Sequence, residues 1–253
     1  MADRFTARGR AGRARSRRLA WWAGGVVVLV AAVVYLIAFS PLLVVEDVVV
    51  TGADDDVASM ARQHAAIPPM RPLARVDTAA AADRVAADTR VKTVEVRRDW
   101  PSVITIALTL REPEAILTQP GRPVALVDGS GVAYEAVATG PEGLLRITAP
   151  RGPIDQESLA GALRARSALE PSWRRQVSQM QITTDGDLRF SIGSAAVLWG
   201  RPEAEEAKGA ALRALLAQEG IDPDDDGAPV TIDVTAPQTP VVSGLPPAPT
   251  PDE

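Results

Sequence analysis

Two strands and the turn between them are predicted by residues 91–111, VKTVEVRRDWPSVITIALTLR. Polar and apolar residues alternate in the first half, as in a strand with one buried face. Trp100-Pro101-Ser102 breaks the alternation and predicts a turn. The apolar residues of the returning strand fall on one face, namely Ile104, Ile106, Leu108 and Leu110. We therefore expect an antiparallel pair of strands here.

The residues before this pair predict a strand and two helices. Residues 42–51, LLVVEDVVVT, are rich in β-branched side chains and end at a glycine, which predicts a strand. Three aspartates at 54–56 precede a predicted helix at 57–66, where acids favour a helix start. A second helix is predicted at 77–87. The order strand, helix, helix, strand, strand predicts a small α+β domain over residues 43–112, with helices layered on a three-stranded sheet.

A second domain, mixed β with two helices, is predicted for residues 113–244. Its helices are expected at 155–169 and 202–218. Its strands are expected at 115–118, 123–127, 132–135, 144–148, 177–183, 188–192, 195–199 and 230–235. The proline-rich residues 245–253 are too polar to pack and predict a disordered tail.

A single transmembrane helix is predicted at residues 19–39, which contain no charged side chain. Such a helix is about 31 Å long, and a bilayer's hydrocarbon core is about 30 Å thick. The first 20 residues carry seven arginines and one acid, a net +6, whereas the whole chain is −5. The positive-inside rule then places residues 1–18 in the cytoplasm and the remaining, acidic body outside, as in a type II membrane protein.

The alternative for this segment is a cleaved signal peptide. Ala38-Phe39-Ser40 has the small-x-small form of a cleavage site. However, the apolar run exceeds the usual 7–15 residues, and Pro41 would follow the cleaved bond. These two features favour a retained anchor.

The composition argues against catalysis and against a cofactor. The chain has no cysteine and one histidine, His64, so thiolate metal sites and histidine-based triads lack their residues. Ser130 lies between glycines but has no base nearby in sequence, and its context is a hairpin turn. The acidic body also argues against nucleic acid as a partner, because phosphates require clustered Lys and Arg. We expect no enzyme and no small-molecule substrate.

One acidic stretch resembles the start of a calcium-binding loop. Residues 222–227, DPDDDG, place aspartates at alternate positions before a glycine, and Asp233 stands at the twelfth position. Pro223 and Pro229 disfavour that loop, and the residues that follow predict a strand where a helix is required. A solvated acidic turn is the alternative, and the sequence favours it. The aspartates at 54–56 could likewise chelate a cation, but their position at the start of a predicted helix explains them.

The chain contains a series of motifs that, taken in sequence order, resembles the FtsQ/DivIB family of cell-division proteins. Its alanine- and arginine-rich composition resembles an actinobacterial member. The likeness extends from the basic tail to about Gly244. The motifs are Val48-Val49-Val50-Thr51-Gly52, Val94-Glu95-Val96-Arg97-Arg98-Asp99-Trp100-Pro101, Arg111-Glu112-Pro113-Glu114-Ala115, Leu126-Val127-Asp128-Gly129-Ser130-Gly131-Val132, a helix over 200–216 with Lys208, and Ile232-Asp233-Val234.

The resemblance implies a POTRA domain at 43–112 and the family's β domain at 113–244. It also implies a non-enzymatic scaffold of the divisome at the septum, which binds FtsB and FtsL and helps to control septal peptidoglycan synthesis. A partner strand would add to the last strand by β-augmentation. The residues that this implies as partner-binding are Ile232, Asp233, Val234, Thr235, Ala236, Gln238, Thr239, Val241 and Val242.

Two prolines depart from the family pattern at this edge. Pro237 and Pro240 lack a backbone N–H and would interrupt a long ladder. Either the pairing is shorter here, or the binding strand ends near Thr235. A POTRA-containing component of envelope transport or assembly is the alternative function; it would need several POTRA units or a barrel, and the sequence predicts neither.

Overall fold

The computed structural model describes residues 21–32, 34–35, 43–218 and 230–244. The chain divides between Leu110 and Arg111 into an N-terminal unit and a C-terminal unit. Each unit has its own sheet and its own hydrophobic core.

The expected membrane segment is described only in part. Residues 21–32 and 34–35 are helical, and the other positions of 19–39 lie outside the described residues, as do the basic tail at 1–18 and the proline-rich residues 245–253. Within the described part of the chain, no helix has the length and apolar character that crossing a membrane requires.

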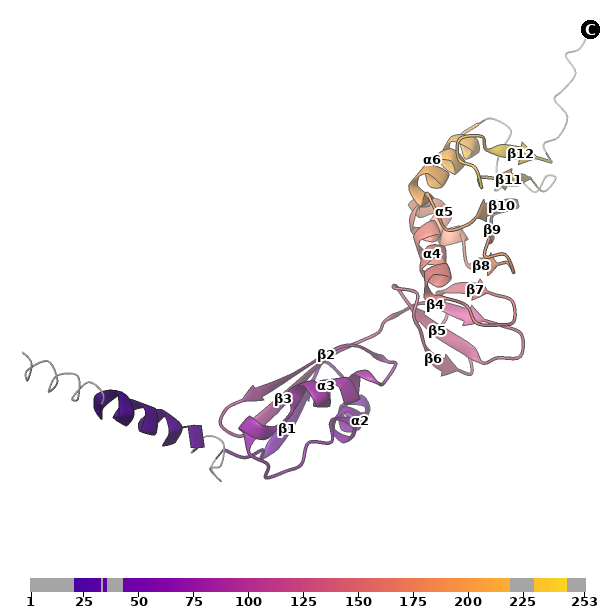
Figure 1. Ribbon diagram of the computed structural model, residues 1–253. Coiled ribbons are helices and arrows are strands. Elements are labelled where there is room, and N and C mark those ends of the chain that lie inside the picture. Colours follow the sequence, from indigo (N-terminus) through magenta and orange to yellow (C-terminus); the bar gives the residue numbers. More distant parts are fainter. Residues whose placement is uncertain (1–20, 33, 36–42, 219–229, 245–253) are drawn as a thin grey trace, which may run out of the picture. The chain divides into compact units, whose positions relative to one another are not determined.

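The N-terminal unit has the predicted order of strand, helix, helix, strand, strand. Its three strands lie in the order β1-β3-β2, with β1 parallel and β2 antiparallel to β3. Both helices lie on one face of this sheet (Figure 1). The elements are β1 (Asp47–Thr51), α2 (Asp55–Ala65), the 3-10 turn η1 (Leu73–Arg75), α3 (Thr78–Ala86), β2 (Val91–Asp99) and β3 (Val103–Leu110).

Aspartate caps and one apolar strand face determine this unit. The carboxylates of Asp54 and Asp77 accept the backbone N–H groups of Val57 and Ala80, so each helix begins directly after its aspartate. The predicted apolar face of β3 forms the centre of the core, where Ile104 and Ile106 are fully buried. The first strand is shorter than predicted, because the chain before Asp47 forms only an isolated bridge between Val44 and Pro72.

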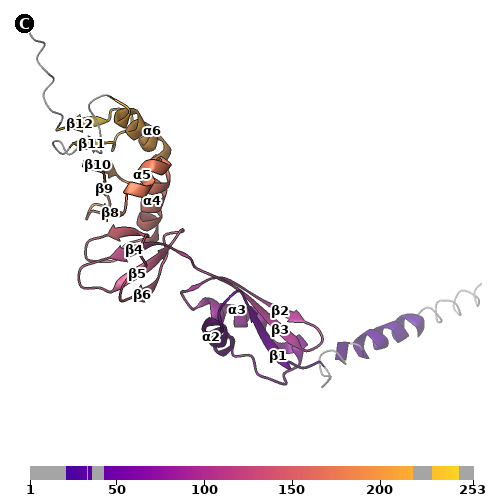
Figure 2. The same cartoon turned by 180° about the vertical axis from the view of Figure 1, so that it is seen from behind.

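The C-terminal unit is a mixed nine-stranded sheet with helices on one side. Its strands follow the order β12-β11-β10-β9-β8-β7-β4-β5-β6. Figures 1 and 2 show α4, α5 and α6 on the same side of β7–β12. The elements are β4 (Pro113–Thr118), β5 (Val124–Asp128), β6 (Ala133–Val137), β7 (Leu145–Thr148), α4 (Gln156–Ser167), α5 (Pro171–Gln176), β8 (Gln179–Ile182), β9 (Leu188–Ile192), β10 (Ala195–Gly200), α6 (Glu205–Leu216), β11 (Thr231–Asp233) and β12 (Val241–Ser243).

Two elements of this unit correct the sequence prediction. The unit has a third helix, α5, which is only six residues long and has no buried residue, so no apolar periodicity indicated it. It also has a further strand, β12, beyond the one that was expected to be last. The sequence predicted residues 230–235 as the last strand, whereas the chain turns and returns to the sheet after Pro240.

Candidate partner-binding edge

The strand that was predicted to form the edge of the sheet is internal. β11 pairs in parallel with β10 on one side and in antiparallel with β12 on the other. Ile232 and Val234 are fully buried within the core of the C-terminal unit. Any partner strand that extends this end of the sheet must therefore pair with β12.

The backbone of β12 has one inner and one outer side, which the hydrogen bonds of β11 define. Val230 O accepts the N–H of Ala196 at 2.9 Å, and Val234 N donates to Leu198 O at 3.0 Å. Backbone groups of alternate residues point to the same side of a strand, so Thr231 and Asp233 point away from β10 and toward β12.

The register of β12 then identifies its outward backbone groups. Thr231 lies opposite Ser243 and Asp233 lies opposite Val241, so these two residues of β12 point inward. Val242 lies between them and directs its N–H and C=O outward. In the part of the chain that the structure describes, no strand pairs with this outer side.

The prolines lie in the connection between the two strands and not within a ladder. Pro237 falls inside a turn closed by the N–H of Thr239, which donates to Ala236 O at 3.0 Å. Pro240 directly precedes β12. The predicted site residues Ala236, Gln238 and Thr239 are exposed on this connection, while Val241, a residue that is 58% exposed, begins β12.

The end of β11 is fixed by a local hydrogen-bonded turn. Asp233 Oδ1 accepts the backbone N–H of Thr235 at 2.9 Å and its hydroxyl at 2.6 Å. The Thr235 side chain packs against Gly200, whose φ is +73°. A Cβ at Gly200 would lie 2.7 Å from Thr235 Cγ2, so this glycine allows the chain to leave β11 along this path.

A buried lysine holds the end of β10. Lys208 Nζ donates to Trp199 O at 2.8 Å and to Arg201 O at 2.7 Å, and only 3% of the residue is exposed. Its ammonium lies 6.0 Å from the centre of the Trp199 ring. Burial lowers the pKa of Lys208, opposed by the charge of Glu205. Its two backbone contacts give the lysine a structural role, which the sequence alone did not reveal.

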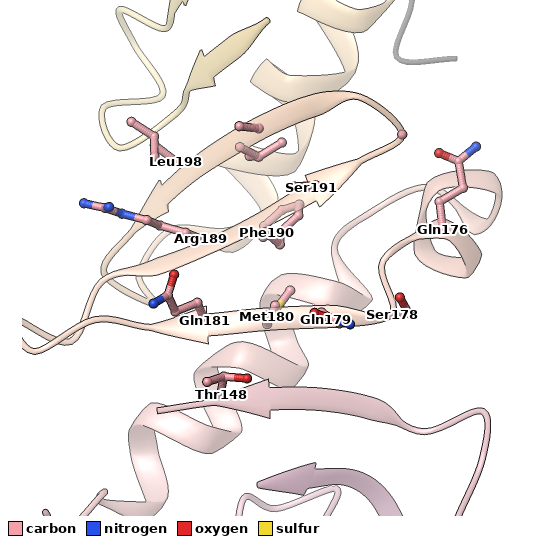
Figure 3. Close-up of a pocket in the computed structure, with 13 residues that line it drawn as sticks. Thr148, Gln176, Ser178, Gln179, Met180, Gln181, Arg189, Phe190, Ser191 and Leu198 are labelled. Atoms are coloured by element: carbon pink, nitrogen blue, oxygen red, sulfur yellow. The ribbon is translucent and has the colours of Figure 1, made fainter. Parts of the chain in front are cut away.

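A broad hollow of about 1030 Å³ lies over β8, β9 and β10. Figure 3 shows Gln181 and Arg189, which are cross-strand neighbours, among the side chains that line it. Arg189 is the one charged residue of this lining, which contains serine and threonine hydroxyls but no carboxylate or imidazole. Among the residues that the structure describes, this lining offers no general base for nucleophilic chemistry.

Among the described residues, no group of three His, Asp or Glu side chains is placed so that it could hold a metal ion. His64 lies exposed on α2. Residues 222–227, the possible calcium loop, lie outside the described part of the chain.

The two units match two family models in turn. One, described as "POTRA domain, FtsQ-type", matches residues 43–111, and the other, "Cell division protein FtsQ/DivIB, C-terminal", matches residues 115–235. The protein named "Cell division protein FtsQ" of Streptomyces bingchenggensis is 32% identical over 191 residues, 72% of this chain and 69% of that protein. This chain belongs to the FtsQ family of cell-division proteins.

Mycobacterial members of the FtsQ family are similar but longer. The relative from Mycolicibacterium smegmatis is 35% identical over 183 residues, which cover 70% of this chain and 50% of that protein. The relative from Mycobacterium leprae is 33% identical over 173 residues, 47% of its length. This chain thus spans about half the length of these relatives, and the resemblance inferred from the motifs is confirmed at the level of the family.

Proposed function

We propose that this FtsQ-family chain is a non-enzymatic scaffold of the divisome that binds FtsB and FtsL at the septum and so helps to control septal peptidoglycan synthesis. The observation that carries the proposal is the outer side of β12, where Val242 offers a backbone donor and acceptor. A partner strand could pair there by β-augmentation, with its backbone groups supplying affinity.

The side chains beside this edge suggest how a partner would be selected. Val242 is half-buried against the core of the C-terminal unit, and Val241, on the other face, is mostly exposed. Side chains of an added strand would alternate in the same way, with one set continuing the core and the other meeting Val241. A partner segment that alternates apolar and polar residues fits this edge.

Membrane anchoring belongs to the same proposal. The uncharged run at 19–39 and the seven arginines before it support a single-pass anchor with a cytoplasmic N-terminus. Such an anchor would keep both folded units on the outer side of the cell membrane, where septal peptidoglycan is made.

Val242→Pro tests the proposed edge. Proline removes the outward N–H of Val242 and leaves the inward groups of Val241 and Ser243 in place, and prolines are tolerated on the open side of edge strands. Val242→Thr is the matched control because it keeps the donor. In a pull-down from cell membranes, we expect Val242→Pro to lose FtsB and FtsL and Val242→Thr to retain them.

Val234→Pro is unsuitable for this purpose, although Val234 is among the residues that the family resemblance implies as partner-binding. The Val234 N–H bonds to Leu198 O inside the sheet, so its loss would damage the fold itself. Capture of both partners by Val242→Pro at the unmodified level would refute binding at β12. A fluorescent fusion of the full chain is expected at midcell in dividing cells; uniform membrane labelling, with normal division after depletion, would refute the divisome role.

A further inference from the structure

The two outer edges of the N-terminal sheet differ in how their backbone groups are used. On β1, the N–H of Val48 donates to the Asp47 carboxylate at 2.7 Å, and its C=O accepts from Arg62 Nε at 3.0 Å. Side chains of the same unit therefore bond both outward backbone groups of Val48, at the middle of this edge. Native sheets commonly protect their edges in this way, because unpaired edges attract other strands.

β2 forms the opposite edge, and its outward groups follow from the register. Gly52, just after β1, approaches Leu108 O, so the even-numbered residues of β3 point toward β1. The odd-numbered residues of β3 then point toward β2, where Ala107 lies opposite Glu95 and Thr105 opposite Arg97.

The intervening residues of β2 direct their N–H and C=O away from the sheet, and these are Val94, Val96 and Arg98. No strand pairs with this side in the described ranges. β2 is nine residues long and contains no proline, and its one irregularity lies at its start, between Val91 and Thr93.

The side chains at this edge leave it accessible to another backbone. Val94 and Val96 pack down against the unit's core. The Arg98 guanidinium is held by the carbonyl oxygens of Leu73 at 3.1 Å and Val76 at 2.6 Å. On the opposite face, Glu95 and Arg97 are exposed and form a long ion pair of 3.9 Å.

We propose that two copies of this chain pair through β2, antiparallel and centred on Val96, joining two three-stranded sheets into one six-stranded sheet. Since Val96 points outward, it would exchange both hydrogen bonds with Val96 of the second copy. Glu95 would then lie opposite Arg97 of the second copy, and Arg97 opposite Glu95 of the second copy. The strand is thus complementary in charge to itself.

The charges select this register among its neighbours. Centring the pair on Glu95 sets two glutamates opposite each other, and centring it on Arg97 sets two arginines opposite each other. Centring the pair on Arg98 sets Arg98 of one copy opposite Arg98 of the other at the two-fold axis. Like charges directly opposite destabilise paired strands, whereas opposite charges stabilise them. Among these registers, only the one centred on Val96 forms two cross-strand ion pairs without placing like charges directly opposite each other.

Charge reversal provides the test, with the full chain in detergent micelles measured by analytical ultracentrifugation. Glu95→Arg and Arg97→Glu each replace both ion pairs by repulsion, and each should weaken dimerisation on the order of tenfold or more. The double variant Glu95→Arg/Arg97→Glu reverses every charge and restores complementarity. It should dimerise like the unmodified chain.

Disulfide trapping tests the register independently, because the chain has no cysteine of its own. In the proposed register Thr93 lies opposite Asp99 of the second copy, in a pair whose Cα atoms are about 4.5 Å apart, within disulfide range. Chains carrying Thr93→Cys should crosslink to differently tagged chains carrying Asp99→Cys more than either crosslinks to itself.

Three outcomes would overturn the proposal: a monomeric unmodified chain, a double variant as weak as the single ones, or crosslinks without the heterotypic preference. Capture of a different protein at β2 by a monomeric chain would likewise overturn it. None of these results tests the proposed partner edge at β12. That edge lies in the other unit, and its test is the capture of FtsB and FtsL.

Discussion

Arg111 and Asp128 form an ion pair in which Nη1 lies 2.5 Å from Oδ2. Only 3% of the Asp128 side chain and 19% of the Arg111 side chain are exposed. The aspartate also accepts the N–H of Ser130 at 2.9 Å, its hydroxyl at 2.7 Å and the N–H of Val132 at 2.9 Å. Two motifs that carry the family resemblance, Arg-Glu-Pro and Asp-Gly-x-Gly, are therefore one structural unit that joins the start of β4 to the hairpin after β5.

Asp128→Asn should destabilise the C-terminal unit. The substitution removes the negative charge beside the Arg111 guanidinium in a half-buried site, and it places a neutral amide where the Ser130 and Val132 N–H groups donate to a carboxylate. Breaking such a pair costs about 2–4 kcal/mol. We expect a loss of this size in urea unfolding followed by hydrogen exchange of β4 and β5 amides. The control Asp185→Asn, in an exposed turn, should change the stability by less than about 0.5 kcal/mol.

The contribution of Asp128 to folding stability should depend on pH in the acidic range. Burial by itself raises the pKa of Asp128, but hydrogen bonds from Ser130, Val132 and Arg111 outweigh it and lower the pKa below 3.8. A carboxyl with a lowered pKa in the folded state stabilises fully above its unfolded pKa, and the contribution is lost as pH falls through the folded value. The stability difference between the unmodified chain and Asp128→Asn should therefore be constant near neutral pH and shrink below about pH 4. A constant difference down to pH 2 would contradict this account.

The sequence predicted local elements well where a cap or a periodic pattern defined them. Asp54, Asp77 and Asp155 all accept an N–H from the first turn of the helix that follows, as their positions suggested. The alternation in β2 and β3 likewise predicted a strand pair and its buried face. These features depend on neighbours in sequence, so one sequence is enough to recognise them.

The candidate site was harder to predict because it depends on the order of strands in the sheet. Nothing local distinguishes β11 as an internal strand, since its neighbours β10 and β12 are separated from it by a helix or a proline-containing turn. Pro237 and Pro240 suggested an interrupted edge, but Pro237 lies in the turn and Pro240 just before the new edge strand. The predicted region was therefore near the open edge, while two of its residues, Ile232 and Val234, proved to be core.

Lys208→Met should destabilise the C-terminal unit although it removes a buried charge. Methionine matches the lysine in length but leaves the carbonyl oxygens of Trp199 and Arg201 without their donor, at a cost of about 2 kcal/mol. Because burial lowers the pKa of Lys208 below 10.5, the unfolded state binds more protons between the two values. The advantage of the unmodified chain should therefore grow as pH rises toward 10.5. Thermal unfolding of both proteins at several alkaline pH values measures this difference in stability. If the Lys208→Met variant is as stable as the unmodified chain at every pH, the two hydrogen bonds of Lys208 contribute nothing.

Gly200→Ala should weaken both the fold and the proposed partner edge. Its φ of +73° disfavours a side chain, and the new Cβ would push against Thr235, which is bonded to Asp233 at the end of β11. Gly186→Ala is the matched control, since Gly186 has a φ of +84° but nothing within 4 Å of the added Cβ. The backbone strain costs about 1 kcal/mol in both variants. The further loss of folding stability in Gly200→Ala, beyond that of Gly186→Ala, therefore measures the clash with Thr235. We expect greater destabilisation and lower capture of FtsB and FtsL for Gly200→Ala than for Gly186→Ala, measured by urea unfolding and membrane pull-down. Equal losses in the two variants would mean that the path of the chain after β11 does not depend on close packing at Gly200.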